Sequence, residues 1–261
     1  MRKWLAAVLC MVAGALAGSA AGQAPAAALN TAFNTGETLD FDLTWVSITG
    51  GAMRMTIGVM ANDPMHYHIS SVAKSNPSFA FIYSVRDEVA SVVNRDDFST
   101  VRYEKHMKEK GKSKDDTTTV DEARRVATRQ RPGKTPQVAN VPKPVFDPLS
   151  LVYHLRSLDL KPGTVPRFTV YADGKTYTLE ANVDHTETIG TPAGTFHTVV
   201  VQPKMLAGTI FKDEGSMTIW FTDDARHIPV RIRSELKFGS ITANLRSIRT
   251  GATDPEPPIG R

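Results

Sequence analysis

Apolar residues at every second position are the feature that most restricts the fold of this chain. Two such segments lie close together, one with Leu39, Phe41, Leu43 and Trp45 and the other with Met53, Met55, Ile57 and Val59. Successive side chains of a β-strand point to opposite faces, so this spacing places one face in a core and the other in water. The segments predict two paired strands, and Gly50-Gly51 between them predicts a hairpin loop that uses positive φ angles.

The same signal recurs along the rest of the chain. A clear hairpin is predicted over 168–183, where the turn falls at Asp173-Gly174, a dipeptide typical of type I′ turns. Further strands are predicted over 66–73, 88–93, 101–107, 195–202, 217–221, 228–238 and 241–248, whereas 79–83 is either a strand or a helical turn. The expected fold class is therefore mainly β, an antiparallel, strongly curved sheet or incomplete barrel with one covering helix.

The covering helix is expected to begin after Asp147. This residue suits an N-cap, Pro148 suits the first helical position, and leucines at 151, 155 and 158 share one face. The β-rich domain is expected over 33–250, with candidate halves at 33–131 and 147–250 joined by a proline-rich connector at 132–146. Two subdomains and one continuous sheet crossed by the connector both fit this pattern, and the tail 251–261 is expected to be disordered.

Residues 1–22 have the organisation of a signal peptide. A basic start is followed by an apolar stretch over 4–16 and by small residues before the end, which predicts export to the periplasm or secretion. Cys10, the only cysteine, lies inside this segment, so the mature chain forms no disulfide and depends on its core. Lipid attachment at Cys10 is disfavoured because the bulky Leu9 precedes it. The mature chain has no apolar stretch of the roughly 20 residues that a transmembrane span needs.

Charge is nearly balanced over the mature chain but uneven along it. Without Arg2 and Lys3, 29 basic residues face 27 acidic ones, so no nucleic-acid partner is expected. Residues 98–134 hold 11 basic and six acidic residues. This basic hairpin would be attracted to anionic lipid headgroups or lipopolysaccharide phosphates. The preferred explanation is a solvated hairpin whose lysines discourage edge-to-edge pairing of strands.

Several short segments occur in a characteristic order. They are 33–39 leading to Trp45 and 50–52, Asp147-Pro148-Leu149-Ser150, 190–196, and 219–224 followed by 228–230. Together they resemble a bacterial envelope family known as domain of unknown function 3108 (DUF3108), over roughly 33–248 of the chain. The resemblance implies an exported β-rich protein. It implies no catalytic residues, because the family has no established chemistry.

Two histidines are weak candidates for a metal site. His66 and His68 are separated by one residue, so on a strand both imidazoles face the same side and reach one ion. Zinc normally takes three or four ligands, and the mature chain offers neither a cysteine nor a His-Glu-x-x-His helix. A pair of surface histidines is the preferred interpretation, and no metal or other cofactor is expected.

Asp223, Asp224 and His227 are weak candidates for catalysis. Adjacent residues on a strand face opposite sides, so the two aspartates share a substrate only if a turn separates them. A role in bonding turn amides ahead of the next strand is favoured. The mature chain lacks a Gly-x-Ser-x-Gly elbow, a thiol nucleophile, a phosphate loop and a dinucleotide fingerprint, so the sequence favours a non-enzymatic protein without excluding an enzyme.

Large apolar side chains are the weak candidates for ligand binding. Trp45, Met53, Met55 and Phe81, with Phe79 and Tyr83 nearby, suit a sheet that adapts to an apolar ligand, although core packing also explains them. The favoured hypothesis is an exported envelope protein that binds an apolar or envelope ligand without catalysis. The alternatives are a hydrolase acting on an envelope polymer and an assembly module that docks through the basic hairpin. A lipid, lipopolysaccharide or an envelope protein is the expected partner.

Overall fold

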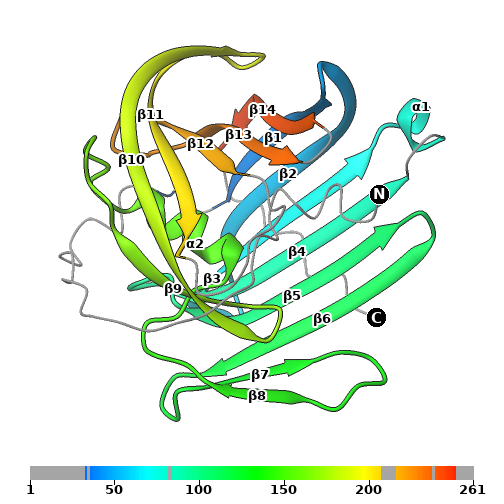
Figure 1. Cartoon of the computed structure of the whole chain (residues 1–261), viewed down its shortest axis with the longest axis vertical. Coiled ribbons are helices and arrows are strands. Elements are labelled where there is room, and N and C mark those ends of the chain that lie inside the picture. Colours follow the sequence, from blue (N-terminus) through cyan, green and yellow to red (C-terminus); the bar gives the residue numbers. More distant parts are fainter. Residues whose placement is uncertain (1–32, 34–35, 82–83, 207–215, 237–238, 251–261) are drawn as a thin grey trace.

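The structure is a computed structural model that describes residues 33, 36–81, 84–206, 216–236 and 239–250 (Figure 1). The predicted signal peptide and C-terminal tail lie outside the described residues. Two helices occur in the described part of the chain, α1 (Pro77–Ala80) and α2 (Pro148–Arg156). The strands are β1 (Glu37–Trp45), β2 (Ile48–Met60), β3 (Asp63–Ser75), β4 (Val85–Asn94), β5 (Thr100–Glu109), β6 (Lys112–Asp121), β7 (Val126–Gln130), β8 (Gln137–Asn140), β9 (Arg167–Ala172), β10 (Lys175–Thr191), β11 (Gly194–Met205), β12 (Met217–Thr222), β13 (Pro229–Leu236) and β14 (Gly239–Arg249).

All these strands belong to one antiparallel sheet of 14 strands. Strands that follow one another in sequence are paired, except β8 and β9, and β1 also pairs with β14. The sheet therefore has its two edges at β8 and β9, which are neighbours in sequence. It curls strongly but does not close, with α2 inside the curl (Figure 1), which confirms the predicted mainly β class. The proline-rich stretch 132–146 contains β8.

Helix α2 begins where the sequence predicts. Oδ1 of Asp147 accepts hydrogen bonds from two backbone N–H groups of the first turn, each at 2.8 Å, and Pro148 occupies the first turn, where its missing N–H costs nothing. The other carboxylate oxygen of Asp147 accepts from Ser91 at 2.5 Å and from Thr100 at 2.8 Å. The cap thus also fixes the helix to β4 and β5, at the end of the sheet where β4 ends and β5 begins.

A buried ion pair fixes the other end of α2. Arg156 donates from both terminal nitrogens to Glu37, at 2.6 and 2.9 Å, and the two side chains are 0% and 2% exposed. The ring of Phe33 lies 4.5 Å from the guanidinium carbon. Paired, doubly hydrogen-bonded charges are tolerated in an interior where a single charge is not. This pair joins the helix to the first residue of β1, so α2 fills the end of the curl at which β1 starts.

Glycines 50 and 51 do not form the predicted loop. The β1–β2 turn is made by Val46 and Ser47, with φ of 43° and 78°, and both glycines lie inside β2. A Cβ on Gly50 would lie 3.0 Å from the Phe79 ring, and a Cβ on Gly51 would lie 2.5 Å from the Lys74 carbonyl oxygen. The prediction of a glycine loop was therefore wrong. These glycines are needed for close approach of neighbouring segments rather than for a turn.

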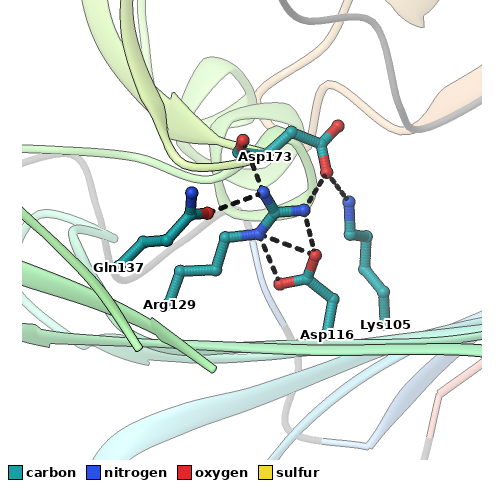
Figure 2. Close-up of polar contacts among 5 residues, drawn as sticks. All are labelled: Lys105, Asp116, Arg129, Gln137 and Asp173. Carbon is teal, nitrogen blue, oxygen red and sulfur yellow. Dashed lines mark hydrogen bonds and ion pairs between the residues drawn. The ribbon is translucent and has the colours of Figure 1, made fainter. Parts of the chain in front are cut away.

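The β9–β10 turn is the predicted type I′ turn, with φ of 50° at Asp173 and 83° at Gly174. It rests on the inner face of β5 to β7, where it meets a cluster that we call the polar clasp: Lys105, Asp116, Arg129, Gln137 and Asp173 (Figure 2). Arg129 donates to both oxygens of Asp116, and its Nη1 donates to the Asp173 carbonyl at 2.7 Å. Lys105 donates to the Asp173 carboxylate at 2.5 Å.

The polar clasp connects the two wings of the sheet, by which we mean β1 to β8 and β9 to β14, although their edge strands β8 and β9 are not paired. Lys105, Asp116 and Arg129 are buried, and each charge faces an opposite one. Beside the clasp, Tyr171 of β9 packs on Ala127 of β7 in a small apolar cluster. Side-chain contacts at the turn, with backbone hydrogen bonds of Phe146 to Thr169 and Tyr171 at 2.9 and 2.8 Å, thus take the place of the backbone ladder that would close a barrel.

We expect Gly174→Ala to destabilise the fold more than Gly163→Ala does. The φ angles are 83° and 86°, so both substitutions introduce similar backbone strain, of about 1 kcal/mol or more. A Cβ on Gly174 would also lie 2.9 Å from Oε1 of Gln137 and 3.2 Å from Nη1 of Arg129, whereas nothing lies within 4 Å of a Cβ on Gly163. Urea unfolding measures the difference. Equal losses for the two variants would show that the clasp does not support the fold.

Candidate functional site

Three of the turns at the end of the curl opposite α2 are held together by backbone hydrogen bonds. They are the β1–β2 turn, the β3–β4 connection with α1, and the β5–β6 turn. The N–H of Asn76 donates to the Gly50 carbonyl at 2.9 Å, and the N–H of Lys110 donates to the Ser84 carbonyl at 3.0 Å. Because neighbouring strands are antiparallel, all three turns lie at the same end of the sheet. They make a continuous border there, visible around α1 in Figure 1.

This border carries an apolar cluster that we call the aromatic rim: Trp45, Val46, Ile48, Phe79 and Phe81. The Trp45 and Phe79 rings meet edge to face, with centroids 6.3 Å apart. Val46, Ile48 and Phe81 are 59%, 60% and 95% exposed. Two of the predicted ligand-binding residues, Trp45 and Phe81, therefore belong to neighbouring turns. Large apolar side chains gathered at one border are typical of a binding surface, unlike apolar residues scattered singly.

The other two predicted ligand-binding residues lie deeper. Met53 and Met55 are 3% and 0% exposed and belong to the main hydrophobic core below the rim. Met107, Met217 and Leu236 are only partly buried and pack against that core near the ends of their strands on the rim side. The rim is thus backed by flexible methionines, which adapt to ligands of different shapes. Tyr83, also considered from the sequence, lies outside the described residues.

A buried carboxyl group lies inward of the rim. Asp87 is on the inner face of β4, two residues beyond Val85, and is 4% exposed. Its neighbours across the sheet are Ala73 on β3 and Met107 on β5. Neither carboxyl oxygen has a hydrogen-bond partner of good geometry among the residues that the structure describes. A buried polar group in this state is costly for the fold, so its presence calls for a specific explanation.

Burial raises the pKa of Asp87 to about 7, and the negative charge of Glu109 adds to the rise. The backbone amide of Lys108 opposes the rise only in part. The buried lysine on the next strand, Lys105, is held by Asp173 in the polar clasp. Near neutral pH, Asp87 can therefore either donate a proton in a hydrogen bond or accept one. It is suited to contact the polar group of a ligand whose apolar part packs on the rim.

The histidines proposed for metal binding lie on the outer face of β3. They share one face, as expected, and both bind the same carboxylate, with His66 2.7 Å and His68 2.8 Å from the oxygens of Asp63. Burial alone would raise the pKa of Asp63, but the hydrogen bonds and charges of the two histidines lower it below its usual value. Among the described residues, no group of three or more His, Cys, Asp or Glu side chains is arranged to hold a metal ion.

The residues proposed for catalysis share the turn between β12 and β13, at the α2 end. Oδ1 of Asp224 accepts hydrogen bonds from Thr222 at 2.7 Å and from the His227 backbone N–H at 3.2 Å. His227 Nδ1 lies 3.1 Å from the Arg156 carbonyl oxygen, and the Asp223 side chain is exposed. The contacts of Asp224 are those of a residue that stabilises a turn. Hydrolysis at this turn remains a prediction without a further supporting contact.

Neither Asp87 nor the polar clasp was predicted from the sequence, for different reasons. Asp87 occupies an inward position in the alternation Val85, Asp87, Val89, and a charge at an apolar position is a signal that sequence reasoning can detect. Arg129 gives no such local signal, because Asp116 and Asp173 come from separate parts of the chain.

Asp87→Asn should stabilise the protein at pH 8 and have little effect at pH 4. Between the ordinary pKa of 3.8 and the folded value of about 7, the folded state keeps a proton that the unfolded state releases. Stability therefore falls as the pH rises through this window, by roughly 4 kcal/mol at most, and the asparagine variant avoids the loss. Urea unfolding of both proteins from pH 4 to 8 measures the difference.

The comparison must be made as a difference between the two proteins, because burial lowers the pKa of His154 to about 4 and this residue titrates in part of the same range. Asp223→Asn, at an exposed aspartate, is the matched control and should leave the profile unchanged. A pH-independent effect of Asp87→Asn would contradict the assigned pKa.

Comparison with known proteins gives a family but no activity. No curated protein matches the sequence significantly. The solved structure of a beta-barrel-like protein of family DUF1849 from Brucella abortus is similar to this one, with a TM-score of 0.57 and 9% sequence identity. The alignment covers 82% of this chain and 97% of that protein, and at this identity the likeness concerns the fold alone. Two further solved structures reach TM-scores of only 0.34 and 0.38. The first is a candidate lipoprotein from Parabacteroides distasonis with 13% sequence identity, and the alignment covers 82% of this chain and 95% of that one. The second is a hypothetical protein from Chlamydia trachomatis with 8% identity, and the alignment covers 87% and 93%.

No described helix has the length and apolarity required to cross a bilayer. A family described as protein of unknown function (DUF3108) matches residues 40–246 of this chain, and these residues include most of the curled sheet. This match confirms the resemblance found in the sequence, and the chain belongs to the DUF3108 family.

Proposed function

We propose that the chain is an exported, non-enzymatic binding protein of the cell envelope that holds an apolar or amphipathic ligand at the aromatic rim. The observation that carries this proposal is the exposure of Val46, Ile48 and Phe81 around the Trp45–Phe79 contact. Soluble proteins seldom gather large apolar side chains on one exposed border unless that border binds something.

The two ends of the curl differ in a way that supports a ligand at the rim. The α2 end is filled by the helix, its buried cap Asp147 and the Glu37–Arg156 ion pair. The rim end has partly exposed methionines and the buried carboxyl of Asp87. Ligand sites are typically apolar with a few polar groups that fix orientation, and the mouth of a curled sheet is a common place for them. A ligand with an apolar part and one polar group matches this combination.

Export is part of the proposal and depends on residues 1–22. Their basic, apolar and small-residue regions suit a signal peptide, which would deliver the chain to the periplasm or the exterior. In that compartment a lipid, lipopolysaccharide or an envelope protein is available to the rim. The hydrolase alternative has no specific support, because Asp224 is occupied by its own turn.

Phe81→Ser should weaken binding of a monomeric long-chain fatty acid by about tenfold, since burying a phenylalanine side chain stabilises by roughly 1.5–3 kcal/mol. Phe81 is 95% exposed and its removal should leave the unfolding free energy unchanged. The change in intrinsic tryptophan fluorescence, with Trp45 close to the site, measures the affinity below the concentration at which the fatty acid forms micelles.

Met65→Ser is the matched control for this experiment. Met65 is 72% exposed and lies at the start of β3, at the end of the sheet away from the rim. Its replacement should leave the affinity unchanged. Native mass spectrometry and lipid extraction of protein purified from its own host complete the test. A protein that retains no ligand and shows turnover of an envelope polymer would refute the proposed function.

A further inference from the structure

We infer that the rim end of the molecule docks on the surface of an anionic lipid bilayer, with the aromatic rim entering the headgroup region and the lysines of the β5–β6 hairpin contacting lipid phosphates. The inference goes beyond ligand binding, because it concerns a surface of the protein rather than a ligand held by it. It combines three features of the same border: exposed apolar tips, a rigid backbone beneath them and a local excess of positive charge.

The apolar tips are held in an unusual conformation. Val46 has φ of 43°, a region that a β-branched residue rarely adopts, yet its side chain is 59% exposed. Its N–H donates to the Ser240 carbonyl at 3.3 Å, and a Cβ on Gly239 would lie 2.6 Å from the Val46 side chain. The fold thus maintains a strained turn whose apolar residues face water. Strain of this kind is typical of functional sites, where the surroundings enforce it.

Positive charge lies on the β5–β6 turn, which follows the β3–β4 connection along the same border. Lys108, Lys110, Lys112 and Lys114 are all exposed and flank the β5–β6 turn, and only two acidic residues, Glu109 and Asp115, occur among 108–115. The Lys110–Ser84 backbone bond joins this turn to the connection that carries Phe81. The sequence alone shows a basic segment, but only the sheet places its turn next to the connection that carries Phe81.

This combination fits a membrane surface better than either feature alone. Apolar tips gain by entering the boundary between headgroups and acyl chains, and nearby lysines gain by approaching anionic phosphates. An exposed β-ribbon that only needed to avoid edge pairing would require the lysines but not the exposed Phe81 and Ile48 at the same border. A protein partner would also bury the apolar tips, and the experiment below distinguishes a protein partner from a bilayer.

The test is flotation of the protein with vesicles of phosphatidylcholine alone and of phosphatidylcholine with about 30% phosphatidylglycerol. We expect binding to the anionic vesicles only, weakening severalfold between about 0.05 and 0.5 M salt. Lys112→Glu with Lys114→Glu should reduce binding by about tenfold or more. The matched control, Arg124→Glu with Arg125→Glu, makes the same charge change at exposed positions on the β6–β7 turn, at the opposite end, and should have little effect.

Insertion of the tips is tested separately with Phe81→Trp and the control Met65→Trp. Both positions are exposed, so neither variant should alter folding, which thermal unfolding checks. Lipids brominated on their acyl chains should quench the added fluorescence at position 81 and not at position 65. The inference would be overturned if the Lys112→Glu/Lys114→Glu variant and the Arg124→Glu/Arg125→Glu control lost binding equally. It would also be overturned if fluorescence at position 81 were not quenched.

Failure of docking is distinguishable from failure of the proposed function. If the protein binds monomeric fatty acid but no vesicle, the proposed ligand binding at the rim is supported and bilayer docking is refuted. A protein that binds anionic vesicles with the expected variant pattern supports docking even if no fatty acid binds. Binding to an envelope protein through Phe81, with no affinity for either kind of vesicle, would also refute the inference.

Discussion

The pairing of β1 with β14 is the contact on which the rest of the structure depends. It joins the first and last strands of the sequence, so that seven strands follow on the β1 side, from β2 to β8, and five on the β14 side, from β13 back to β9. Asp40 reinforces the pairing, because it accepts hydrogen bonds at 2.8 Å from Arg54 on β2 and Arg249 on β14. Burial would raise the pKa of Asp40, but these two cations hold it below its usual value. Without this central pairing, the two wings would share no backbone ladder.

Charges inside the curl are arranged in two contrasting ways. In the Glu37–Arg156 pair and in the polar clasp, every buried charge is matched by hydrogen-bonded opposite charges, which makes burial tolerable and fixes α2 and the β9–β10 turn in position. Asp87 is the exception, since its carboxyl has no well-formed partner among the described residues. The contrast matters for function. The matched clusters lie where the fold must be held together, and the unmatched carboxyl lies behind the aromatic rim.

The fold also separates a closed end from an exposed one. At the α2 end, the helix cap, the ion pair and the rings around Phe33 fill the curl. At the other end, backbone bonds fix three turns whose tips remain in water. The proposed ligand binding at the rim and the proposed bilayer docking both use this asymmetry, and they differ in whether a lipid leaves its bilayer. The DUF3108 match establishes the family.

Local signals in the sequence determined the class of fold, the type I′ turn at Asp173-Gly174 and the start of α2 at Asp147, because period-two alternation, turn chemistry and capping act over a few residues. The sequence predicted a solvated hairpin over 98–134 but not the bounds of the polar strands β6 to β8, since their inner face carries Asp116 and Arg129 in place of apolar residues. Only the tertiary structure decided that Gly50 and Gly51 serve close approach and that Trp45 meets Phe79. Those features depend on which distant strands become neighbours, and strand pairing across a long chain leaves no trace in a short stretch of sequence.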